Sequence, residues 1–182
     1  MDGYAGQYCA HISCQNERRE LHQNLTEAVE ELLKCFKKIN SCLPSNIIVY
    51  RDGVGEGNFD DVLKVELVSI REAVENASSY CGESAVIPVA IVICQKRHNS
   101  RFAYTPNGNG SSANEFINLC PGACIDAAGG LHSVTSRESN EFYINSHVAI
   151  QGTAKPCRYT LLYDQIGLKV SPTTVSVNNH PC

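Results

Sequence analysis

The feature that most restricts the fold of this chain is its alternation of short β-branched runs with longer amphipathic segments. Residues 46–50 and 85–94 are rich in Ile and Val, a pattern typical of strands buried on both faces. Apolar residues recur every three or four positions over 24–40 and 59–74, which predicts two helices with one apolar face each. This order of elements predicts an α/β fold with a mixed sheet.

Shorter patterns complete the expected fold. Three further segments have the composition of strands, residues 7–14, 141–146 and 157–163. Residues 105–114 are rich in Asn, Gly and Ser, which predicts a flexible loop. Residues 165–182 show no sustained hydrophobic period, so we interpret them as a divergent, disordered tail.

Composition bounds the partners and the compartment. The 182 residues carry a formal net charge of −4, which argues only weakly against nucleic acid, because a local Lys/Arg cluster can bind phosphates within an acidic chain. No stretch approaches the ~20 apolar residues of a membrane span, and a secretory signal is absent. We therefore predict an intracellular protein of the cytoplasm or nucleus, with no membrane partner. Five of the ten cysteines lie in apolar-patterned segments and are expected to be reduced: Cys9, Cys14, Cys35, Cys94 and Cys157.

Polar residues follow both buried runs. Arg51 and Asp52 follow residues 46–50 and begin a glycine-rich turn, while Lys96 and Arg97 come one residue after the run at 85–94. Each has a plain alternative, because Asp-Gly is ordinary turn chemistry and a charge run usually lies in water at the end of a sheet. From the residues alone, these positions suggest a site and no particular reaction.

Three phrases give the chain a family resemblance. Residues 50–57 read YRDGVGEG, residues 95–101 read QKRHNSR and residues 146–156 read SHVAIQGTAKP. In that order they resemble the YRDGVSEG, QKRHHTR and SHAGIQGTSRP segments of the Argonaute/Piwi family. The resemblance runs over residues 1–164 and implies an RNase H-like mixed sheet flanked by helices. It implies an incomplete PIWI domain, which lacks the first strand and the C-terminal part.

The resemblance also implies a catalytic set. Slicing members of the family use an Asp-Glu-Asp-His set that holds two divalent cations, Mg²⁺ or Mn²⁺, around the attacking water and the leaving oxygen. By resemblance Asp52 is the second aspartate and a metal ligand, and Glu20 falls at the position of the inserted glutamate finger. Read alone, Glu20 is a solvated charge beside a helix. The first aspartate and the histidine are expected to lie outside these residues, so we predict neither stable metal binding nor cleavage.

A second implied site binds the guide strand. The resemblance assigns guide-phosphate contacts to Arg97, Arg101, His147 and Lys155, with Lys96 in the same basic turn and Gln151 as a weaker candidate beside them. Lys155 replaces the usual Arg with a point charge, so we expect weaker orientation of the phosphate there. Phosphate contacts hold a strand without reading its bases.

Together these features favour a PIWI-domain fragment that binds guide RNA and target RNA in small-RNA-guided gene silencing. Two alternatives remain open. One is a guide-dependent RNA endonuclease that cuts once the domain is complete, and the other is a remnant that docks other silencing proteins. Because the strand at 46–50 is expected to lack one neighbour, we also predict an open sheet edge beside Ile47, Ile48 and Val49 and a tendency to aggregate.

Overall fold

The computed structural model describes residues 8–15, 21–82, 86–104, 116–126 and 141–168. By its internal contacts the chain divides into two compact units. The first is drawn from Met1–Val49, Val54–Ile91 and Tyr163–Gly167, and the second from Tyr50–Gly53, Val92–Leu162 and Leu168–Cys182.

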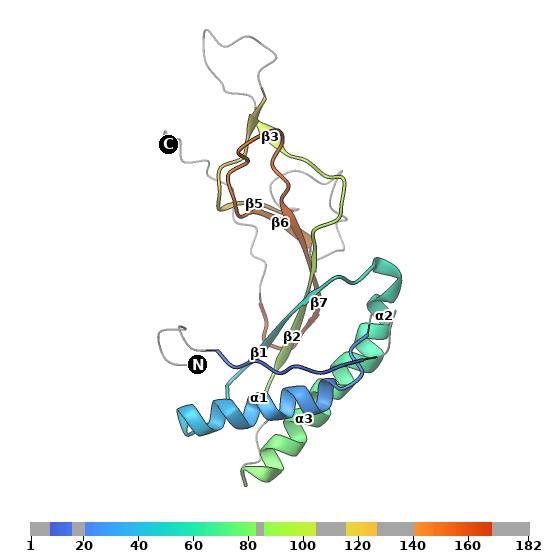
Figure 1. Cartoon of the computed structure of the whole chain (residues 1–182), viewed down its shortest axis with the longest axis vertical. Coiled ribbons are helices and arrows are strands. Elements are labelled where there is room, and N and C mark those ends of the chain that lie inside the picture. Colours follow the sequence, from blue (N-terminus) through green and yellow to red (C-terminus); the bar gives the residue numbers. More distant parts are fainter. Residues whose placement is uncertain (1–7, 16–20, 83–85, 105–115, 127–140, 169–182) are drawn as a thin grey trace. The chain divides into compact units, whose positions relative to one another are not determined.

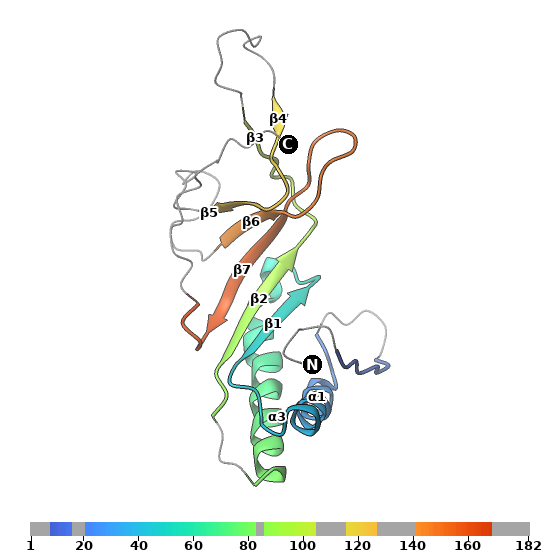
Figure 2. The same ribbon diagram turned by 90° about the vertical axis from the view of Figure 1, so that its left-hand side faces the viewer.

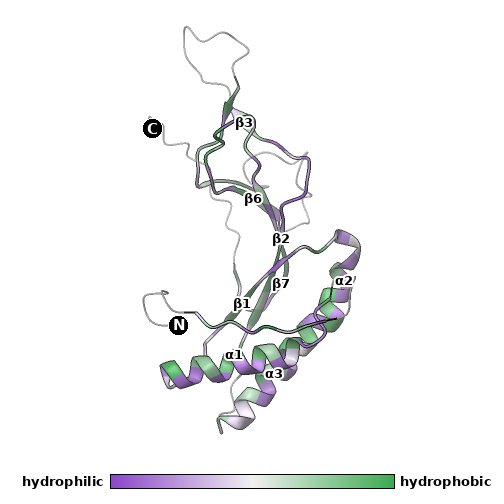
Figure 3. Cartoon of the chain, in the orientation of Figure 1, coloured by the Kyte–Doolittle hydropathy of each residue, from purple (hydrophilic) through white to green (hydrophobic). Residues whose placement is uncertain are grey.

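Two long helices belong to the first unit (Figure 1). Helix α1 spans Leu25–Asn40 and packs against α3, which spans Leu67–Tyr80. Both predicted helices are therefore confirmed, and the colouring in Figure 3 shows hydrophilic and hydrophobic residues alternating along each. The residue after α1, Ser41, has a left-handed backbone (φ 62°), and its N–H donates a hydrogen bond to the Lys37 carbonyl that closes the last turn.

The apolar faces of these helices meet in one cluster. Its buried members come from both helices and from the segment before the strand that begins at Val89, namely Leu33, Val74, Ala77 and Ile87. The half-buried side chains of Val29, Leu43 and Ile47 pack against them. This cluster joins the two helices to Ile47, where the first strand begins, and to Ile87, which precedes the next strand.

The helix before α3 is irregular. It starts with a 3₁₀ turn at Glu56–Asn58 and a short α2 at Phe59–Asp61, and then widens to a π-helical turn at Val62–Glu66. Glu66, within that turn, is buried and accepts a hydrogen bond from the His22 backbone N–H (3.1 Å). The wide turn therefore carries a buried carboxylate that ties residue 22 to the helix.

Five strands form the main sheet, in the order β1-β2-β7-β6-β5. Their bounds are Ile47–Asp52, Val89–Gln95, Cys157–Asp164, Glu141–Asn145 and Ala123–Asp126 in that spatial order. The pairs β5–β6 and β6–β7 are antiparallel, whereas the arrows of β1 and β2 point the same way in Figure 2. A separate antiparallel pair joins β3 (Ala103–Tyr104) to β4 (Ile117–Asn118). The predicted α/β fold with a mixed sheet flanked by helices is confirmed.

Two strand predictions need correction. Residues 8–14, the described part of the predicted strand at 7–14, form no strand, and Tyr8 and Ile12 are almost fully exposed. Alternation alone does not make a strand, because each backbone N–H and C=O still needs a neighbouring strand to pair with. The prediction that residues 46–50 are buried on both faces is also wrong, since Ile48 and Tyr50 are exposed. β1 lies at the end of the strand order, as the predicted open edge requires.

The cysteine prediction is partly wrong. Cys9 and Cys35 are joined by a disulfide between the N-terminal segment and α1, so they are not a reduced pair. The other three expected thiols, Cys14, Cys94 and Cys157, are free. Burial raises the pKa of the Cys94 thiol to about 11, which keeps it protonated and unreactive.

Some predictions fall partly or wholly outside the described residues. These are the flexible loop at 105–114 and nearly all of the tail at 165–182, of which only 165–168 is described. Among the helices that the structure describes, none combines the length and the apolar character needed to cross a bilayer.

The helix cluster predicts a large difference between two substitutions in α1. Leu33→Ala removes a buried side chain and should lower the free energy of unfolding by about 2–5 kcal/mol. Ile39→Ala, on the same helix but 46% exposed, should lower it by less than about 1 kcal/mol. Urea unfolding of both variants and the parent measures the difference. Equal losses would show that α1 does not pack through Leu33.

Candidate functional site

The ends of β1 and β2 bring an acid and a base together. Asp52 is the last residue of β1, Lys96 follows the last residue of β2, and the two strands are neighbours in the sheet. Lys96 Nζ donates a hydrogen bond to Asp52 Oδ2 at 2.7 Å, and the side chains are 71% and 57% exposed. The hydrogen bond from Lys96 lowers the pKa of Asp52, and the same bond raises the pKa of Lys96. Both groups are therefore charged at neutral pH.

A cavity of about 480 Å³ surrounds this pair. Beside Asp52 and Lys96, it is lined by aromatic, aliphatic and thiol side chains, namely Tyr50, Cys94, Phe142, Ile144, Cys157 and Tyr159. Phe142 and Tyr159 are cross-strand partners whose rings stack 5.1 Å apart. Burial, with a hydrogen bond involving Cys157, raises the pKa of Tyr159 to about 12, so this hydroxyl stays neutral.

The residues around Asp52 do not fit a divalent-metal site. Mg²⁺ and Mn²⁺ prefer several oxygen ligands, and the lining of this cavity contains one carboxylate with an ammonium group against it. Within the described residues, no group of three or more His, Cys, Asp or Glu side chains is placed to hold a metal ion. Glu20, the second predicted member of the catalytic set, lies outside the described residues.

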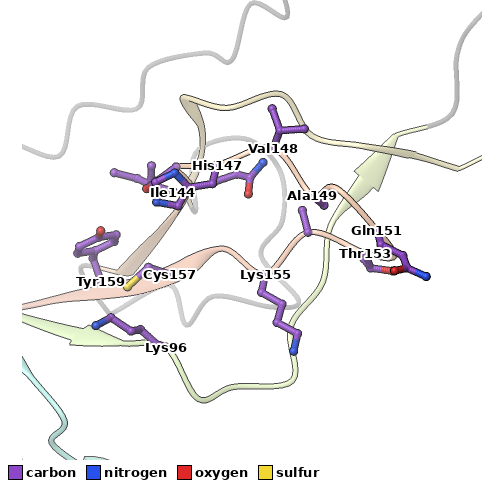
Figure 4. Close-up of a pocket in the computed structure, with 13 residues that line it drawn as sticks. Lys96, Ile144, His147, Val148, Ala149, Gln151, Thr153, Lys155, Cys157 and Tyr159 are labelled. Atoms are coloured by element: carbon purple, nitrogen blue, oxygen red, sulfur yellow. The ribbon is translucent and has the colours of Figure 1, made fainter.

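A second cavity, of about 520 Å³, collects most of the predicted phosphate-binding residues (Figure 4). Lys96 reaches it from the end of β2, while His147, Gln151 and Lys155 reach it from the loop between β6 and β7. Backbone and small side chains of the same loop form much of the remaining wall. We call this cavity the basic groove, defined by Lys96, His147, Gln151 and Lys155.

Arg97 and Arg101 lie elsewhere on the same turn. Neither lines the basic groove or the cavity around Asp52, and both side chains are exposed. Arg101 Nη1 donates hydrogen bonds to the His98 carbonyl (3.0 Å) and the Ser100 carbonyl (2.7 Å), so part of its donor set is used within the turn. The structure thus brings four of the six predicted residues together and leaves two outside.

Residues between these cations fix the turn in place. The His98 ring donates from Nε2 to the Pro156 carbonyl (2.8 Å) and lies edge-on to Tyr143, with ring centroids 5.3 Å apart. Phe102 lies edge-on to the same Tyr143 ring at 5.0 Å, and Ser100 Oγ is 3.4 Å from its hydroxyl. Tyr143 is buried, so the turn after β2 is anchored both to the sheet and to the loop that carries Lys155.

Two asparagines that the sequence analysis missed hold the loop of the basic groove. Asn118 donates from Nδ2 to the Gly152 carbonyl (2.8 Å) and accepts at Oδ1 from the Ala154 N–H (2.9 Å). One side chain therefore fixes the backbone on both sides of Thr153. Asn145, which is buried, donates to the Leu119 carbonyl (2.7 Å) and ties the segment after Asn118 to β6. No local pattern marks Asn118, because its partners lie more than thirty positions away in the sequence.

Comparison with known proteins agrees with the fold and the phrases. The family model described as Piwi domain matches residues 1–174. Protein argonaute 5 of Arabidopsis thaliana is 32% identical over 181 residues, a match that covers 92% of this chain and 17% of that protein.

Three solved structures are similar in fold. Kluyveromyces polysporus Argonaute with a guide RNA gives a TM-score of 0.69 at 30% identity and covers 82% of this chain and 17% of its own. The C-terminal lobe of a budding yeast Argonaute gives 0.66 at 31% identity, with 79% and 29% covered. Drosophila Piwi gives 0.62 at 25% identity, with 80% and 18% covered. The chain thus spans less than a third of the length of each relative named here.

The asparagine bridge predicts a local effect on the loop. Asn118→Ala removes both hydrogen bonds to residues 152 and 154, so the Ala154 amide should exchange with deuterium about five-fold faster, as expected for a hydrogen bond of roughly 1 kcal/mol. Asn99→Ala, an exposed asparagine in the same unit, should leave this exchange unchanged. Mass spectrometry or NMR of exchange measures both. Unchanged exchange in Asn118→Ala would contradict the bridging role.

Proposed function

Because this chain belongs to the Piwi domain family of Argonaute proteins, a family that acts in small-RNA-guided silencing, we propose that it binds RNA phosphates through the basic groove. The RNA is a guide strand, alone or paired with its target. The observation that carries the proposal is the convergence of Lys96, His147, Gln151 and Lys155 from two separate loops on one cavity. A silencing role of this kind places the protein inside the cell, in the cytoplasm or the nucleus.

The chemistry of the groove supports a phosphate ligand. Lys155 is an exposed lysine of the groove, and the exposed Arg97, which does not line the groove, adds positive charge on the turn that carries Lys96. His147 and Gln151 add hydrogen-bonding groups at the same wall. Contacts of this kind hold a strand by its backbone, so binding depends on salt and not on base sequence. The solved Kluyveromyces polysporus relative contains a guide RNA, which fits this class of ligand.

We further propose that the chain binds RNA without cutting it. The Piwi family uses divalent metal ions, and two-metal cleavage needs several oxygen ligands around the reacting phosphate. The two expected ligands are Glu20, which lies outside the described residues, and Asp52, which is paired with Lys96. The described residues that line the cavity around Asp52 include no second carboxylate. Asp52, with an ammonium group against it and no second carboxylate beside it in the cavity, is therefore poorly suited to bind a divalent cation.

Binding should weaken when single charges are removed from the groove or from the turn that carries Lys96. Lys155→Gln and Arg97→Gln should each reduce affinity for all RNA sequences alike and lower the slope of log K against log salt by about one. Lys64→Gln, in the first unit and 72% exposed, should change neither quantity. Fluorescence anisotropy of a labelled single-stranded RNA over a salt series measures the effect. Full affinity in Lys155→Gln would place the RNA elsewhere.

Cleavage should be absent. With Mg²⁺ or Mn²⁺ present, the purified chain incubated with a guide-paired, end-labelled RNA should give no product above the level of an Asp52→Ala variant. Denaturing gel electrophoresis measures this. Cutting by the parent that disappears in Asp52→Ala would show an assembled metal site and would favour the endonuclease alternative over binding alone.

A further inference from the structure

Lys96 lines both cavities described above. Its side chain lines both the basic groove and the cavity around Asp52, and its ammonium group lies 2.7 Å from the Asp52 carboxylate. Lys155, the other lysine of the groove, is exposed and has no carboxylate partner among the described residues. The groove therefore contains one lysine with an internal anionic partner and one without.

An RNA phosphate in the groove would meet this ion pair. If Lys96 turns to the phosphate, its hydrogen bond to Asp52 is lost. If Lys96 keeps that bond and uses another of its three donors, the phosphate sits beside a carboxylate of the same charge. Both outcomes cost binding free energy, and the Asp52 carboxylate is the origin of the cost in each case.

We propose that Asp52 is an internal competitor of RNA at Lys96, so that it weakens phosphate binding in the basic groove. This inference rests on the proposed function, because it needs an RNA phosphate in the groove. It gives Asp52 a role different from the metal ligand that the sequence resemblance implies. The residue sets how much of the charge of Lys96 is available to a bound strand.

The expected effect is modest and depends on salt. The two side chains are more than half exposed, and exposed ion pairs are weakened by water and by dissolved ions. Removing the carboxylate should therefore tighten binding by roughly two- to five-fold at low salt, and the gain should shrink as salt is raised. The sign of the change in affinity distinguishes the two roles. Removal of a competing carboxylate increases RNA affinity, whereas removal of a residue that supports binding decreases it.

The test is a two-by-two set of variants of the full chain. Asp52→Asn keeps the shape of the side chain and removes its charge, and Lys96→Gln removes the ammonium group. Affinity for a labelled single-stranded RNA is measured by anisotropy for the parent, each variant and the double variant. EDTA is present, so that no divalent ion contributes. Glu75→Gln, on an exposed position of α3, controls for the change in net charge.

We expect Asp52→Asn to bind more tightly than the parent and the gain to vanish in the Lys96→Gln background. An unchanged or weaker Asp52→Asn, or an equal gain from Glu75→Gln, would overturn the inference and leave the proposed function standing, provided that Lys155→Gln still weakens binding. If Lys155→Gln and Lys96→Gln both bind as the parent does, the proposed function itself fails. Circular dichroism checks folding, and Asp52→Ser serves as a second neutral variant should Asp52→Asn not fold.

Discussion

The burial of β2 is the constraint on which the rest of this structure depends. Six consecutive residues, from Val89 to Cys94, are buried, so the strand cannot slide or turn over without exposing apolar surface. Its position beside β1 in the sheet then brings Lys96, just past its end, to the end of β1, where Asp52 lies. The ion pair that shapes the candidate site is thus a consequence of where two strands stop.

The shape of the basic groove depends on side-chain hydrogen bonds to the backbone of one loop. A loop between two antiparallel strands has no fixed shape of its own, and the loop between β6 and β7 receives its shape from side chains elsewhere in the second unit. Asn118 fixes the backbone around Thr153, and His98 holds the Pro156 carbonyl. These bonds place Lys155 and Gln151 on the wall that Lys96 also reaches. Asn118 and His98 thereby decide where the lysines of the groove lie.

The sequence predicted those elements whose formation depends on the pattern of neighbouring residues. Periodicity located α1, the helix that ends in α3, and the strands β2, β6 and β7, because burial of one face leaves a direct mark on the order of residues. It failed at 7–14, where the pattern was present but the described residues form no strand. It also missed β5, Asn118 and the Cys9–Cys35 bridge, since each depends on partners far away in the chain.

Contacts between residues far apart in the sequence also explain why the roles predicted for Asp52 and Lys96 were incomplete. Family phrases placed Asp52 with metal and Lys96 with phosphate, as members of separate sites, because a linear motif carries no information on which side chains face each other. In the folded chain the two groups are hydrogen-bonded, and their charges cannot be considered apart. Among the described residues, the cavity around Asp52 holds no second carboxylate, so the Asp52 charge acts mainly on its nearest cation, Lys96. For a chain whose formal net charge is −4, any affinity for RNA must come from a local cluster, so the charge available at each lysine of that cluster matters more than the total.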